Sequence, residues 1–213
     1  MQYPDANTED LIYQFRVTLQ GTQPMVWRRI LVPGTYTFWD LHVAIQDAMG
    51  WLDYHLHLFR LRNPGTGEVD QIGIPIDDSV DDMEPFLPGW EVAMAQYFSE
   101  PGDRADYDYD FGDGWRHEVV LEEISDKSSS AQYPICLDGA RACPPEDCGG
   151  IHGYKELLVV LSDPTHEEYT NMLRWIGAGY DAAMFDPKNV RFDDPKKRWQ
   201  QAFEDRSSSK LTH

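Results

Sequence analysis

Residues 106–123 read DYDYDFGDGWRHEVVLEE and carry the clearest hairpin signal in the chain. Polar and apolar residues alternate on both sides of Asp113-Gly114, a dipeptide typical of two-residue type I′ turns. A turn at this dipeptide places Asp110 opposite His117 on neighbouring strands, with Cβ atoms about 4.5–5.5 Å apart. The same register sorts the remaining side chains: Asp106 and Asp108 share the face of the histidine, and Tyr107, Tyr109 and Phe111 share the other. The sequence therefore predicts an antiparallel hairpin that holds an imidazole beside a carboxylate.

The N-terminal part of the chain predicts the order strand, strand, helix, strand. Residues 11–21 alternate apolar and polar side chains, and residues 25–34 form a second strand that ends in a Pro-Gly pair. Residues 55–63 alternate again after the intervening helix. This order is typical of a β-grasp-like arrangement. We expect an α+β fold in which helices pack against a mixed or antiparallel sheet.

Capping signals mark the helices. Residues 37–40 form a variant capping box, Thr followed by Asp, for a helix that ends at Gly50. Residues 154–161 have apolar side chains at helical spacing, and residues 165–168 form a second capping box for a helix that ends at Gly177. The last two helices are expected to pack as neighbours.

We expect one domain over residues 11–205, between a flexible N-terminus, 1–10, and a disordered tail, 206–213. Residues 64–105 are rich in Pro, Gly, Asp and Glu and predict a long excursion that carries short elements and covers a groove.

Charge limits the classes of partner. The chain of 213 residues has 37 acidic and 18 basic residues, a net charge of -19, which repels phosphate backbones and anionic membrane surfaces. Direct nucleic-acid binding is therefore disfavoured, and the basic stretch 187–199 is expected to be a solvated face. No apolar run has the length of a membrane span and the first residues lack signal-peptide character, so we expect a cytoplasmic protein that does not associate with membranes.

The stretch CPPEDCGG, residues 143–150, allows two interpretations. Thiolates and imidazoles are the ligands that structural zinc prefers, although the cysteine spacing here is not that of a recognised zinc finger. The ligands of a zinc site would be Cys136, Cys143, Cys148 and His117, with His152 as the alternative imidazole. The other interpretation is a stiff connection, because prolines fix φ and glycines allow a sharp turn before the following helix.

A catalytic interpretation centres on the hairpin and the loop 143–150, which we expect to share one cavity. A carboxylate orients an imidazole and raises its basicity, so Asp110 and His117 are candidates for a general base, with Glu146 as a further catalytic carboxylate. A structural hydrogen bond at the sheet surface explains the same pair. The histidines of HLH, 55–57, either line the same groove and share a metal or are polar positions of a strand. No nucleophile elbow or phosphate-binding loop is present.

Several blocks together resemble the plasmid pRiA4b ORF-3-like family. They are PMVWRRILVP, LHVAIQDAMGW with HLHLF, YDYDFGDGWRHEV, CLDGARACPPEDCGGIHGY and FDPKNVRFD. The resemblance covers most of residues 11–203 and implies an α+β domain linked by name to plasmids and mobile elements. It implies no settled activity and no established catalytic residues.

Two functions therefore stay open. The first is an acidic binding or accessory module whose aromatic, His- and Asp-lined groove takes a peptide, a protein or a small ligand. The second is a metal-dependent, hydrolase-like enzyme that uses the His, Asp and Cys residues named above.

Overall fold

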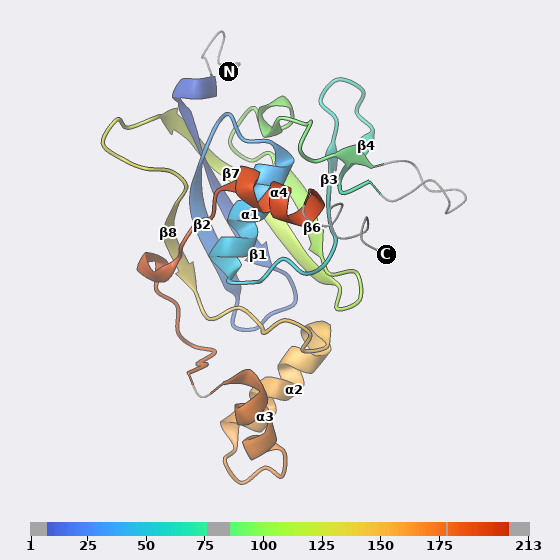
Figure 1. Cartoon of the computed structure of the whole chain (residues 1–213), viewed down its shortest axis with the longest axis vertical. Coiled ribbons are helices and arrows are strands. Elements are labelled where there is room, and N and C mark those ends of the chain that lie inside the picture. Colours follow the sequence, from blue (N-terminus) through green and yellow to red (C-terminus); the bar gives the residue numbers. More distant parts are fainter. Residues whose placement is uncertain (1–7, 76–85, 178, 205–213) are drawn as a thin grey trace, which may run out of the picture.

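The computed structural model describes residues 8–75, 86–177 and 179–204. Within these residues, eight strands form one mixed sheet in the order β5-β4-β3-β6-β7-β1-β2-β8, antiparallel at every junction except β4–β5 (Figure 1). The strands are β1 (Leu11–Leu19), β2 (Val26–Pro33), β3 (His57–Arg62), β4 (Val69–Gly73), β5 (Leu87–Pro88), β6 (Arg104–Tyr109), β7 (Trp115–Asp126) and β8 (Ile135–Ala140). The predicted α+β class is confirmed.

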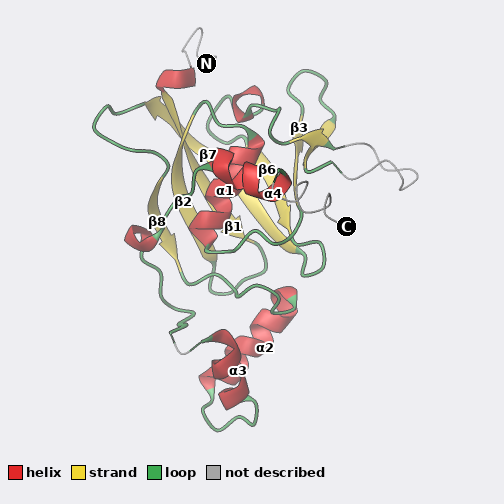
Figure 2. Cartoon of the chain, viewed as in Figure 1, coloured by secondary structure: helices red, strands yellow, loops and turns green. Residues whose placement is uncertain are grey.

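The helices lie in two places. The α-helices are α1 (Phe38–Met49), α2 (Gly150–Ser162), α3 (Tyr169–Ile176) and α4 (Pro195–Phe203), and the 3-10 helices are η1 (Thr8–Asp10), η2 (Met94–Gln96) and η3 (Pro187–Asn189). Helix α1 covers one face of the sheet and α4 packs on α1, whereas α2 and α3 form an arm beyond the sheet (Figures 1 and 2). No helix in the described part of the chain has the length and apolar character needed to cross a bilayer. Residues 1–7 and the predicted tail 206–213 lie outside the described residues.

The alternation in β1 and β2 produces the core as predicted. The two strands pair antiparallel, and the apolar face of β1 is buried under α1. Those buried residues are Leu11, Tyr13, Phe15, Val17 and Leu19. The strand β3 pairs with β4 and β6 rather than with β1 or β2, so the predicted β-grasp-like arrangement is not confirmed.

Helix α1 begins and ends where the sequence predicts. The Thr37 hydroxyl accepts a hydrogen bond from Asp40 N, the Asp40 carboxylate accepts one from Thr37 N at 2.9 Å, and Gly50 ends the helix at φ 91°. The excursion 64–105 supplies β4, β5 and η2 and pairs with the start of this helix, because Phe38 N donates to Val92 O at 3.0 Å. It therefore extends the sheet and supports α1.

The predicted register of the central hairpin is wrong by three residues. His117 pairs with Tyr107, and Trp115 pairs with Tyr109, so residues 110–114 form the loop. Asp110 leaves the strand because its backbone is left-handed, with φ 54°, and its Oδ1 accepts hydrogen bonds from the amides of the loop. This register buries Tyr107, Tyr109, Trp115 and His117 on one face of the sheet. The free energy gained by burying these large rings is greater than the turn preference of the Asp113-Gly114 dipeptide, so burial sets the register.

Two further expectations need correction. Helix α3 has no side-chain cap, because the Thr165 hydroxyl donates to Asp163 Oδ1 at 2.6 Å instead.

The stretch 187–199 is not merely a solvated face. Arg198 of α4 is largely buried, and its guanidinium donates to Asp47 Oδ1 at 2.7 Å. Such a pair fixes α4 on α1.

Candidate metal centre

Three segments that are distant in the sequence meet at the end of the sheet that faces the arm. Gly149 N donates to Asp113 Oδ2 at 3.1 Å, and a Cβ added at Gly150 would lie 2.2 Å from the Asp113 carbonyl oxygen. This close approach requires glycine. The Trp51 indole donates to Pro144 O at 2.9 Å. The segments held together in this way are 51–56, 110–114 and 143–150.

His55 lies among carboxylates from the other two segments. Its Nε2 atom is buried and has no hydrogen-bond partner among the described residues. The oxygens around it are Asp147 Oδ1 at 3.2 Å, and Asp110 Oδ2 and Glu146 Oε2, both at 3.6 Å. Asp110 and Glu146 are largely buried, whereas the Asp147 side chain is 69% exposed. The cluster is therefore closed toward the protein and open beside Asp147.

The backbone holds two of these carboxylates in costly conformations. Asp110 has φ 54° and Asp147 has φ 56°, the left-handed region that non-glycine residues seldom adopt. Asp110 is fixed there by Leu56 O, which accepts a hydrogen bond from its amide at 3.0 Å, and by the bonds from loop amides to Oδ1. These bonds leave Oδ2 for His55.

Glu146 is oriented by groups that surround it. Its Oε1 accepts hydrogen bonds from Leu52 N at 2.7 Å and from the Tyr109 hydroxyl at 3.1 Å. Burial, followed by the nearby Glu146 charge, raises the pKa of the Tyr109 phenol, which therefore stays protonated and serves as a donor. Tyr109 in turn is packed against Trp51, with ring centroids 5.0 Å apart. Glu146 is thus fixed beside His55.

The donor set and its spacing fit a transition-metal ion. One ligand atom each from His55, Asp110 and Asp147 lies within 4.8 Å of the others, and this is the only group of three such atoms in the described part of the chain. Ligands about 2.0–2.2 Å from a tetrahedral zinc ion are about 3.3–3.6 Å apart. The separations measured from His55 Nε2, 3.2 and 3.6 Å, are close to that spacing. An imidazole with carboxylates suits Zn²⁺, Mn²⁺ or Fe²⁺.

Comparison with known proteins places the chain in a family. The family model described as plasmid pRiA4b ORF-3-like protein matches residues 11–189. The chain belongs to this family. It is 35% identical over 192 residues to the uncharacterised protein y4hQ of Sinorhizobium fredii (strain NBRC 101917 / NGR234), a match that covers 88% of this chain and 94% of the relative.

A solved structure extends the likeness of this pRiA4b ORF-3-like chain to the fold. The crystal structure of the protein of unknown function MM3350 from Methanosarcina mazei Go1 is similar with a TM-score of 0.78 and 43% sequence identity. The match covers 86% of this chain and 99% of that one.

The structure separates the residues predicted to form a catalytic pair. Asp110 lies beside His55, whereas His117 is fully buried in β7 and its Nδ1 is 3.2 Å from Tyr107 O. Burial lowers the pKa of His117 to about 3. Glu146 does lie in the same cluster as Asp110, so two of the three predicted catalytic residues are brought together.

The predicted zinc ligands do not converge. No three ligand atoms of Cys136, Cys143, Cys148 and His117, all of them described residues, meet the spacing of a metal site. Burial raises the pKa of the Cys136 thiol to about 11 and that of Cys148 to about 12, so both are protonated at neutral pH. The pKa of Cys143 is raised by the same cause. The thiols act here as small packing groups.

The sequence offered His55 as one interpretation of this groove but did not single out Asp147. One of the two interpretations was a metal shared by His55 and His57, but His57 is buried and stacks on His42 with ring centroids 3.5 Å apart. Asp147 was covered only by the interpretation of residues 143–150 as a stiff connection. The available signal was a histidine just before a strand, combined with the carboxylates of a glycine-rich loop.

Proposed function

We propose that this protein binds a divalent transition-metal ion on His55, Asp110 and Asp147, and that the ion takes part in binding its ligand. The observation that carries the proposal is the buried His55 Nε2, which has no hydrogen-bond partner among the described residues and lies 3.2–3.6 Å from three carboxylate oxygens. Three protein ligands leave a coordination position for a ligand or water, as in catalytic metal sites.

Electrostatics favour a divalent ion over a simple ion pair. Asp110, Glu146 and Asp147 bring three carboxylates together in a chain of net charge -19. A protonated His55 supplies one positive charge, which leaves an excess of two negative charges in a partly buried cluster. A divalent cation balances more of this charge while it accepts the lone pair of a neutral imidazole.

Metal analysis tests the proposal. Protein purified without chelator should carry a stoichiometric metal ion, measured by mass spectrometry, and should bind Zn²⁺ or Mn²⁺ in calorimetry. Loss of groups that only support a ligand costs about 10–100-fold in metal affinity, so His55→Ala should cost at least about 100-fold. Asp110→Asn should act similarly, and asparagine tolerates the left-handed backbone at this position.

Matched controls separate this centre from other candidates. His152 is 88% exposed on α2 and pairs with Glu156, so His152→Ala should leave metal affinity unchanged. The double variant Cys143→Ser, Cys148→Ser should also retain the metal. Loss of metal in the cysteine variant with retention in His55→Ala would contradict the proposed centre.

Hydrolysis is a second candidate, favoured by the position of Glu146. A divalent cation lowers the pKa of a water molecule that it binds. Glu146 Oε2 is 3.6 Å from His55 Nε2, oriented by Leu52 N and Tyr109, and so can accept the proton of such a water. The catalytic carboxylate expected at Glu146 is retained, whereas Asp110 becomes a metal ligand.

The Glu146→Gln variant tests this candidate. With a chromogenic peptide amide as probe, metal-loaded wild-type protein should release the chromophore, and Glu146→Gln should be slower by about 10²–10⁴-fold. Metal content should be unchanged in the variant. Equal rates of chromophore release by the two proteins would show that Glu146 is not the general base. The proposal of a metal-dependent binding module would then remain.

We further propose a peptide, protein or small molecule as the partner, because the net charge of -19 opposes nucleic acid and anionic membranes. The unpaired Cys136, Cys143 and Cys148 would stay reduced in the cytoplasm, which is the proposed location. An association with mobile elements is supported by the name of the family alone.

A further inference from the structure

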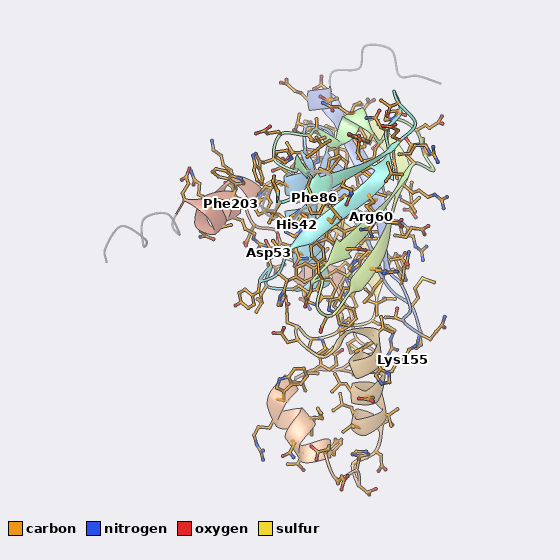
Figure 3. The ribbon with its side chains drawn as sticks, turned by 90° about the vertical axis from the view of Figure 1, so that its right-hand side faces the viewer. His42, Asp53, Arg60, Phe86, Lys155 and Phe203 are labelled. Atoms are coloured by element: carbon orange, nitrogen blue, oxygen red, sulfur yellow. The ribbon has the colours of Figure 1, made fainter. Side chains whose placement is uncertain are left out.

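The arm formed by α2 and α3 contains a groove that adjoins the candidate metal centre. Figure 3 shows Lys155 on this arm, beyond the sheet. The groove has a volume of about 950 Å³, within the range of about 300–1,000 Å³ that binds small ligands. Asp147 and Cys148 contribute to its wall, so one end of the groove lies at the open side of the cluster.

The walls of the groove expose apolar side chains. Leu157 and Val160 of α2 are buried, but Val159 is 63% exposed and Trp175 of α3 is 51% exposed. Helix α3 has no fully buried residue among Tyr169–Ile176, although its apolar side chains are spaced along one face. A groove between two helices with exposed apolar walls suits an apolar peptide segment.

The charged side chains of the groove indicate which kind of peptide it would bind. Asp147, Glu156 and Glu168 line the groove and outnumber its one lysine, Lys155. Together with the net charge of -19, these carboxylates repel an anionic ligand such as a fatty acid. They attract a segment that carries positive charge beside its apolar side chains.

We propose that the groove between α2 and α3 binds a peptide segment with consecutive apolar side chains flanked by basic residues, and that its end reaches Asp147 at the metal centre. The contact with the cation rests on the proposed function, whereas binding in the groove itself does not. The peptide's apolar side chains would cover Val159 and Trp175, and its lysine or arginine side chains would lie near Glu156 and Glu168.

Labelled peptides test the inference by fluorescence anisotropy with metal-loaded and metal-free protein. The probes are acetyl-Lys-Leu-Leu-Leu-Leu-Lys-amide and its twin with glutamate in place of lysine. The lysine peptide should bind at least about tenfold more tightly at low salt. Trp175→Ser should weaken its binding about tenfold because a large aromatic contact is lost. The matched control is Leu137→Ser, which removes a 44% exposed apolar side chain from β8 and should change nothing.

The metal proposal and the groove proposal can be refuted independently of each other. Equal affinity for the two peptides, or an unchanged affinity in Trp175→Ser, would overturn the groove inference even if the protein binds metal. If no metal binds at His55 but the lysine peptide still depends on Trp175, the groove inference stands and the metal proposal falls. With both correct, added metal should change the affinity of wild-type protein for the lysine peptide and have no effect in His55→Ala.

Discussion

At the scale of single residues, His117 makes stability depend on pH. It is fully buried, and burial lowers its pKa to about 3, whereas an unfolded chain has a histidine pKa of about 6.5. Between these values the unfolded state binds a proton that the folded state does not. The contribution of His117 to stability is therefore complete above about pH 6.5 and is lost progressively as the pH falls toward 3.

The variant His117→Gln should reduce this dependence. Glutamine stays neutral at every pH, so the slope of unfolding free energy against pH between 6 and 4 should be smaller by up to about 1.4 kcal/mol per pH unit. Urea unfolding of both proteins at pH 7, 6, 5 and 4 measures this slope. Parallel curves for the two proteins would show that His117 accepts its proton in the folded state, contrary to its burial.

At the scale of elements, the two predicted capping boxes give unequal stabilisation. The Thr37 hydroxyl caps α1, whose start is buried in the core, so Thr37→Ala should lower the free energy of unfolding by about 1 kcal/mol. The Thr165 hydroxyl bonds to the exposed Asp163 and caps no helix, so Thr165→Ala should stay within about 0.5 kcal/mol of wild type. Thermal or urea unfolding compares the stability of the two variants with that of wild type. Equal losses of stability in both variants would contradict the assignment of Thr37 as the only capping residue of the two.

Elements with strong periodicity were predictable and the hairpin register was not. The alternation in residues 11–19 and the caps of α1 are local signals, and both elements appear as expected. The predicted hairpin register relied on the turn signal of Asp113-Gly114. In the structure Asp110 adopts the left-handed conformation, so the loop starts earlier. That choice depends on burying Tyr107 and Trp115 under distant segments, which turn chemistry alone does not encode.

At the scale of the whole molecule, the site arises from the meeting of segments around residues 55, 110 and 147. The sequence predicted that the hairpin and the loop 143–150 adjoin, and the bond from Gly149 N to Asp113 supports that contact. It could not choose between the two interpretations of His55, because His55 reaches the site through long-range packing rather than through strand pairing. The same packing leaves three carboxylates together in an already acidic chain, a charge excess that a bound cation would offset.

Anomalous diffraction from crystals grown with zinc is the most direct test of the metal centre. Data collected on either side of the zinc absorption edge should give one strong peak about 2.0–2.2 Å from His55 Nε2, Asp110 Oδ2 and Asp147 Oδ1. Crystals of His55→Ala grown in the same way should lack it. A wild-type map with no peak among these three residues, or with its peak at the cysteines, would contradict the account.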